Sequence, residues 1–208
     1  MKRAFTFLCA LALAAAALAQ TPQAILSRME DFMKQHDKDG LMMYVDVKVP
    51  IIGTMSTRTY ALGKKARIEA NMMGVDIVSW TDGETAWTYN SKDNRLEIDK
   101  AEKIASSTQP EGDISMFSGI TEGYDLSLEK ETQDAWSIRC KKKKDNTDKD
   151  APKTIDLTVA KGTYAPVSLS TKISGIGLTM RDLSYGVTEQ QVTFRPDDYP
   201  DATVVDKR

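Results

Sequence analysis

Apolar residues follow two different spacings along this chain, first helical and then alternating. The helical spacing starts at Pro22 and places four apolar side chains on one face, namely Ile25, Met29, Phe32 and Met33. Thr21 can cap this helix, and the polar segment 35–40, which ends in Gly40, terminates it. The pattern predicts one amphipathic helix ahead of the alternating region.

From residue 41 onward, apolar and polar side chains alternate with a period of two, which is typical of strands with one buried face. The alternation predicts strands at 41–49, 54–62, 67–72, 75–80, 85–90, 95–99, 124–131, 135–143, 154–160, 165–173 and 177–185. Asp82-Gly83 is a strong signal for a tight hairpin turn. In the tail, residues 194–197 predict a short strand that runs into a proline-interrupted turn.

Residues 100–119 interrupt this alternation. Residues 101–107 have helical spacing, 110–112 form a break, and 114–120 are apolar with helical spacing again. Consecutive long hairpins accumulate twist, and open sheet edges are unfavourable. We therefore expect a mainly β (α+β) fold: a strongly curved antiparallel sheet that forms an incomplete barrel, with an N-terminal helix and a helical lid insertion.

The first nineteen residues have the layout of a secretory signal peptide. Lys2 and Arg3 precede a short apolar run, and Ala17-Leu18-Ala19 predicts cleavage before Gln20. We expect residues 1–19 to be removed and residues 20–208 to form a single domain that is soluble in the periplasm. Loss of Lys2 and Arg3 lowers the net charge from −2 to −4, which does not favour nucleic acid as a partner.

Residues that could support catalysis are few. His36 is the only histidine, and Cys140 is the only cysteine outside the signal, where it alternates with Trp136 and Ile138 as a buried residue would. We expect no catalytic residues, no metal site and no cofactor, and so no enzyme. A hydrolase with paired carboxylates stays open as the alternative, because the chain holds 30 acidic residues whose pairing in space is not visible in a sequence.

Methionine is the distinctive residue type, with ten in the chain. Its flexible side chain fills irregular cores and also suits surfaces that accept variable apolar shapes. Together with a curled sheet and an apolar insertion, this composition indicates an apolar ligand cavity. The predicted cavity and lid residues are Met43, Val45, Val47, Ile68, Ala70, Met72, Met116, Phe117, Ile120, Leu126 and Leu157.

The order of helix, hairpins, helical insertion and hairpins resembles the periplasmic outer-membrane lipoprotein carriers, the LolA-like family. Residues 79–90, with an Asp-Gly turn and Trp87-Thr88-Tyr89, are similar to a strand–turn–strand of that family, and residues 194–197 with 204–206 to its closing segment. The resemblance implies an incomplete barrel with helices as a lid over an apolar cavity. In the family, an Arg-Pro pair after the second strand helps to hold the lid closed. Here Lys65 keeps only the charge, without the planar fork of arginine.

The expected function is that of a monomeric periplasmic carrier. It would bind the acyl chains of lipoproteins, or a related lipid, and deliver them toward the outer membrane with inner- and outer-membrane transfer partners. Lys65 would supply the charge at the rim of the lid. The alternative is an envelope interaction module that uses the curved sheet to dock a protein and carries no lipid.

Overall fold

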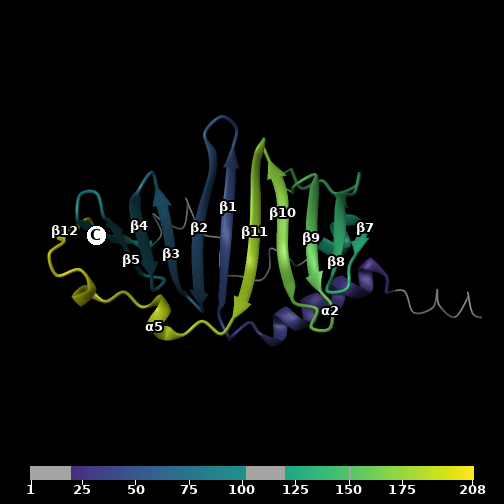
Figure 1. Cartoon of the computed structure of the whole chain (residues 1–208), viewed down its shortest axis with the longest axis horizontal. Coiled ribbons are helices and arrows are strands. Elements are labelled where there is room, and N and C mark those ends of the chain that lie inside the picture. The colour runs from purple at the N-terminus through teal and green to yellow at the C-terminus, as the bar shows by residue number, and fades with distance from the viewer. Residues whose placement is uncertain (1–19, 102–119, 150) are drawn as a thin grey trace, which may run out of the picture.

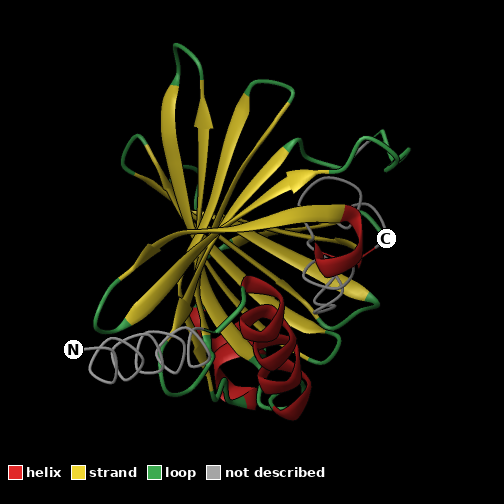
Figure 2. Cartoon of the chain, turned by 90° about the vertical axis from the view of Figure 1, so that its right-hand side faces the viewer, coloured by secondary structure: helices red, strands yellow, loops and turns green. Residues whose placement is uncertain are grey.

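The computed structural model describes residues 20–101, 120–149 and 151–208. A single sheet of twelve strands dominates it, in the order β12-β6-β5-β4-β3-β2-β1-β11-β10-β9-β8-β7. Figure 1 shows these strands side by side from β12 to β7, and Figure 2 shows how widely they fan out when the sheet is viewed from its end. The sheet is curved and open.

The strands are close to those that the alternation predicts. Six of them precede the 102–119 segment: β1 (Leu41–Val49), β2 (Gly53–Leu62), β3 (Lys65–Met72), β4 (Val75–Thr81), β5 (Thr85–Asn90) and β6 (Arg95–Lys100). The other six follow it: β7 (Tyr124–Glu131), β8 (Ala135–Lys142), β9 (Thr154–Ala160), β10 (Pro166–Ile173), β11 (Ile176–Tyr185) and β12 (Thr203–Asp206). Three short helical turns complete the described fold, namely α4 (Ile120–Gly123), α5 (Glu189–Val192) and the 3₁₀ turn η2 (Pro196–Asp198).

Helix α2 (Pro22–Gln35) forms as predicted. The Thr21 hydroxyl accepts a hydrogen bond from the Ala24 amide at 3.2 Å, and Pro22 occupies the first turn, where its missing N–H costs nothing. Four side chains of α2 are buried, namely Ile25, Leu26, Met29 and Met33. One face of the helix therefore packs into the core.

Gly40, between α2 and β1, is required for two physical reasons. Its φ is +69°, and a Cβ atom there would lie 2.8 Å from the Ala61 carbonyl oxygen and 2.8 Å from the Val187 Cβ. We expect Gly40→Ala to lower the free energy of unfolding by about 2–4 kcal/mol, because left-handed strain and overpacking add. Gly63→Ala is the matched control, since Gly63 has φ +57° but no atom lies within 4 Å of the place that a Cβ atom would take. Urea denaturation should show a loss of only about 1–2 kcal/mol for this control; equal losses would contradict the packing argument.

One row of directly paired residues crosses all twelve strands on the face that α2 covers. From β7 to β1 the row is apolar, with Leu128, Ile138, Leu157, Leu169, Met180 and Val45. From β2 to β12 it becomes mostly polar, with Thr57, Ala70, Ile77, Asn90, Arg95 and Thr203. We call this side the helix face and the other side the opposite face. Apart from Leu128, which is exposed, the apolar half of the row belongs to the core that contains α2.

The main core lies between α2 and the half of the sheet from β1 to β7. It joins the buried side chains of α2 to Met43, Ile138, Cys140, Leu157 and Met180, among others. This is the half of the helix face whose row is apolar. Burial against the helix thus explains why the alternation is so regular there.

A second, aromatic cluster lies on the opposite face, over β4 and β5. Trp80 contacts Phe194 and Tyr199 with ring centroids 5.3 Å and 5.6 Å away, and Trp87 stacks on Phe194 at 5.1 Å. Phe194 and Tyr199 belong to the C-terminal segment, residues 186–202, which runs from β11 to β12. The sheet therefore carries a core on each face, one under α2 and one under the C-terminal segment.

The end of the chain differs from the sequence expectation. Residues 194–197 do not form a strand: Pro196 begins η2, and the last strand is β12 at Thr203–Asp206. β12 pairs with β6 in parallel, so the sheet is antiparallel except for this pair. At the other edge, β7 has an irregularity between Leu128 and Lys130. The expected signal peptide and most of the expected lid lie outside the described residues.

Candidate functional site

The eight strand residues predicted to line a cavity all lie on the helix face. Val45 pairs with Thr57, which pairs with Ala70, and Met43 is joined to Ile68 through Thr59 in the same way. Residues that lie directly opposite each other point to the same side of a sheet. The same argument links Leu126 to Val47 through β8, β9, β10 and β11, and Leu157 to Val45 through β10 and β11. The phase predicted from alternation is thus the phase of the structure.

These eight residues differ in how deeply they are buried. Met43 and Leu157 are core residues, and Val45 and Leu126 pack against the core from its margin. Val47, Ile68 and Ala70 are half-buried, and Met72 at the end of β3 is exposed. The residues form a gradient from the core under α2 to the open half of the sheet, and their contact with a ligand remains a prediction.

Of the predicted lid residues, Met116 and Phe117 lie outside the described residues, and Ile120 is described only as the first residue of α4. Lys65, the predicted rim charge, lies on the opposite face, where its Nζ contacts the Glu189 carboxylate at 2.6 Å. Glu189 begins α5 in the C-terminal segment. Lys65 therefore ties the β2–β3 hairpin to the C-terminal segment, and its expected contact with a lid remains a prediction.

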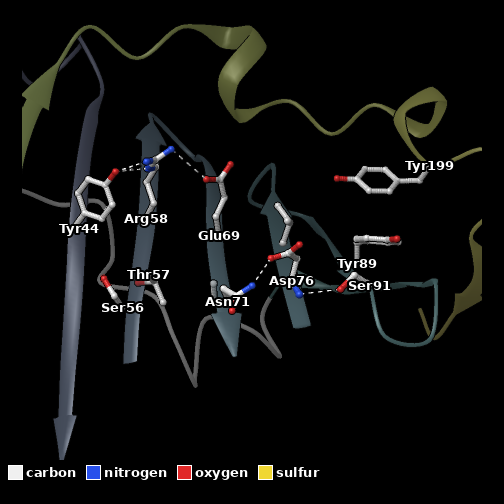
Figure 3. A pocket seen from close by; sticks show the side chains of 12 residues that line it. Tyr44, Ser56, Thr57, Arg58, Glu69, Asn71, Asp76, Tyr89, Ser91 and Tyr199 are labelled. Carbon is white, nitrogen blue, oxygen red and sulfur yellow. Dashed lines mark hydrogen bonds and ion pairs between the residues drawn. The ribbon is translucent and has the colours of Figure 1, made fainter. Parts of the chain in front are cut away.

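A groove lies on the opposite face between β1 and the C-terminal segment (Figure 3). It consists of two adjoining hollows of about 630 Å³ and 340 Å³ that share Tyr44 and Arg58. Its wall residues include Tyr44, Arg58, Tyr60, Glu69, Tyr89 and Tyr199. We call it the tyrosine–arginine groove.

Charged and aromatic side chains hold one another in place along this groove. The Arg58 Nε donates a hydrogen bond to the Tyr44 hydroxyl at 2.8 Å, and the Arg58 guanidinium lies 4.9 Å from the centre of that ring. The Arg181 guanidinium lies 4.7 Å from the same ring centre and contacts Asp46 at 2.7 Å. The hydrogen bond from Arg181 holds the pKa of the Asp46 carboxyl below its usual range. The groove thus combines charged and aromatic side chains, and Arg58, which lines it, is already paired.

Sequence reasoning did not find this groove. Most of its residues occupy the polar phase of their strands, which alternation assigns to solvent, and they come from six strands and the C-terminal segment. A signal was nevertheless present: tyrosines and arginines share that phase in β1, β2 and β3, at Tyr44, Arg58, Tyr60 and Arg67. Paired tyrosine and arginine on one face are typical of recognition surfaces.

The described residues offer little for metal or thiol chemistry. Within residues 20–101, 120–149 and 151–208, no group of three or more His, Cys, Asp and Glu side chains could hold a metal ion. Burial raises the pKa of the Cys140 thiol to about 12, so this side chain is a core residue rather than a nucleophile. None of the described helices has both the length and the apolar character needed to cross a membrane.

Comparisons with known proteins bear on the fold. No family model matches the chain, and no curated protein matches it either. Among solved structures, LprF from Mycobacterium bovis matches with a TM-score of 0.53 and 14% identity, over 80% of this chain and 93% of that one. The lipoprotein LppX from Mycobacterium tuberculosis matches with a TM-score of 0.50 and 14% identity, over 80% and 95%.

A LolA superfamily protein from Nitrosomonas europaea matches with a TM-score of 0.35 and 10% identity, over 86% of this chain and all of that one. At such identities the matches concern the fold alone. The curved, open β fold expected from the resemblance is confirmed, and LprF and LppX share it.

Proposed function

We propose that this protein is a periplasmic carrier that binds the acyl chains of lipoproteins, or a related lipid, on the helix face and delivers them toward the outer membrane. The observation that carries the proposal is the row of paired residues on that face, apolar from β7 to β1 and continued by half-buried Ala70 and Ile77. The row leads from a closed core to a part of the face that α2 does not fill. The LolA-like fold supports the same function.

The energetics suit a reversible carrier. Sequestering a sixteen-carbon chain is worth about 12 kcal/mol gross, at about 0.8 kcal/mol for each methylene group. A carrier must also release its cargo, so part of that gain has to be offset by contacts that the empty protein makes on the same surface. Methionine at positions 43 and 180 suits such exchange, because its flexible side chain repacks easily.

A charge placed on the helix face should weaken acyl binding strongly. We expect Ile68→Asp to weaken the binding of a fluorescent sixteen-carbon fatty acid at least about tenfold, because a carboxylate cannot be desolvated by an alkyl chain without a large cost. Ile68 is half-buried and belongs to the middle of β3, so the substitution changes the face without emptying the core. Titration of the fluorescent fatty acid, with lipid extraction and mass spectrometry of the purified protein, measures the effect.

Val78→Asp is the matched control. Val78 is also half-buried and lies on the neighbouring strand β4, but on the opposite face, where it lines the tyrosine–arginine groove. We expect this variant to bind the fatty acid as the unchanged protein does. Loss of binding in Val78→Asp but not in Ile68→Asp would place the ligand in the groove, and no binding by the unchanged protein would contradict the carrier proposal.

The tyrosine–arginine groove favours a second candidate function, that of an envelope module that docks a protein. Its aromatic and arginine side chains are of the kinds enriched at protein interfaces. Glu69 and Asn71 on its floor offer hydrogen-bond acceptors beside them. Capture of an envelope protein that depends on Arg58 and Tyr89, together with no bound lipid, would favour this candidate over the carrier.

A further inference from the structure

Three neighbouring hairpins turn at the same end of the strands. They are the turns between β1 and β2, between β3 and β4, and between β10 and β11, and their strands follow one another in the order β4-β3-β2-β1-β11-β10. All these neighbours are antiparallel, so the three turns point the same way. Figure 1 shows them along the upper edge, with α2 and α5 toward the lower edge.

These turns carry most of the large apolar side chains that the described part of the molecule exposes. Seven of those ten exposed residues belong to them: Ile51, Ile52, Met55, Met72, Met73, Ile173 and Ile176. The exposed fractions reach 107% for Ile51, 103% for Met73 and 74% for Ile52. We call residues 50–55, 72–74 and 173–176 the apolar tips. The fully exposed side chains of Ile51 and Met73 contribute nothing to the core, so folding does not account for them.

The backbone of two tips shows a related feature. Ile51 has φ +73° and Met73 has φ +52°, in the left-handed region that glycine and asparagine adopt most readily. A β-branched residue in that region is rare and strained. The chain therefore holds an isoleucine and a methionine fully exposed at positions where a smaller or polar residue would fold more easily, which points to a use outside the fold.

Positive charge lies just behind the apolar tips. Lys48 and Lys172 both pair with Gly177, one from each side of β11, and both side chains are exposed. Within the described residues neither lysine has an ion-pair partner. The acidic residues of β1, β10 and β11 are Asp46 and Asp182, and both contact Arg181.

We propose that the apolar tips are a membrane-docking site that inserts into the surface of an anionic lipid bilayer. Separate apolar side chains on the ends of hairpins fit the soft boundary between headgroups and acyl chains, whereas a protein partner would require a continuous complementary surface. Lys48 and Lys172 behind the tips would meet anionic headgroups, to which each lysine adds electrostatic attraction. The proposal does not depend on the carrier function, because it concerns the edge of the sheet and not the helix face.

The test uses flotation of the purified protein with vesicles of phosphatidylethanolamine and phosphatidylglycerol at three to one. We expect the unchanged protein to float with these vesicles, and the double variant Ile51→Asn, Met73→Asn to bind at least about tenfold more weakly. Asparagine tolerates positive φ, so the variant should fold as well as the parent, which thermal denaturation checks. Lys48→Gln with Lys172→Gln should weaken binding to these vesicles and leave any binding to pure phosphatidylcholine unchanged.

Val167→Asn is the matched control, because Val167 is also exposed but lies near the start of β10, at the other end of the sheet. It should float with the vesicles as the parent does. Absence of flotation by the parent, or equal flotation by the tip variant, would overturn the proposal. Either result would leave a protein partner as the occupant of the apolar tips. Fatty-acid titration separates this proposal from the carrier proposal. If the parent and the tip variant bind fatty acid but the parent does not float, only membrane docking is overturned. If the parent floats but does not bind fatty acid, only the carrier proposal is overturned.

Discussion

Trp80→Ala should lower the free energy of unfolding by about 3–5 kcal/mol and release the C-terminal segment from the sheet. Trp80 is buried, and it contacts Phe194 and Tyr199 of that segment as well as the Arg67 guanidinium, 5.6 Å from its ring. No other tryptophan touches both Phe194 and Tyr199 among the ring contacts of the described residues. Guanidinium denaturation measures the stability, and chymotrypsin cleavage after Phe194 measures the release.

Trp136→Ala provides the matched control for this prediction. Trp136 is similarly buried but belongs to the core under α2, where it stacks on Tyr164 with ring centroids 5.5 Å apart. It should lose comparable stability without faster chymotrypsin cleavage after Phe194 under conditions where the protein stays folded. Equal cleavage in both variants would mean that the two faces of the sheet do not have separate cores.

Leu157→Ala should lower the free energy of unfolding by about 2–5 kcal/mol, because it leaves a cavity in the middle of the core under α2. Leu157 is only 1% exposed and lies between Ile138 and Leu169 in the apolar row. Cys140, on the next row of the same core, reports on local opening, since burial raises its thiol pKa to about 12. We expect a thiol reagent to modify Cys140 faster in Leu157→Ala than in the parent.

Thr158→Ala is the control on the same strand. Thr158 pairs with Ser137 and Ser168 on the opposite face, so its replacement should change stability by less than about 0.5 kcal/mol. Cys140 should then react at the parental rate. A faster reaction of Cys140 in Thr158→Ala, or an unchanged rate in Leu157→Ala, would contradict the assignment of Leu157 and Cys140 to one core.

Alternation predicted the strands and their phase well, because burial of one face leaves a direct mark on the sequence. Met43 and Leu157 were assigned to the face that α2 covers, and the pairing of the strands agrees. The segment that covers the second, aromatic core was not predictable in this way. Trp80 and Trp87 are apolar in the opposite phase, and alternation does not say which distant segment, here the one with Phe194, covers them.

The same limit applies to the candidate sites. Ile68 and Ala70 could be placed on a face from β3 alone, but the tyrosine–arginine groove needs residues from several strands and from Tyr199 at once. The apolar tips were hidden for another reason. Ile51, Ile52 and Met73 extend apolar strands in the sequence, and only the order of the strands shows that their turns meet at one edge.

The two outer strands of the sheet bear on whether molecules of this protein join edge to edge. β7 presents charged residues such as Asp125, Glu129 and Lys130 along its length and is interrupted after Leu128, so its free backbone groups do not form a regular template. β12 is only four residues long, and Lys207 and Arg208 follow it. Short, charged or irregular outer strands discourage pairing with another chain. An open sheet of twelve strands can thus remain free of fibrous self-association at high concentration.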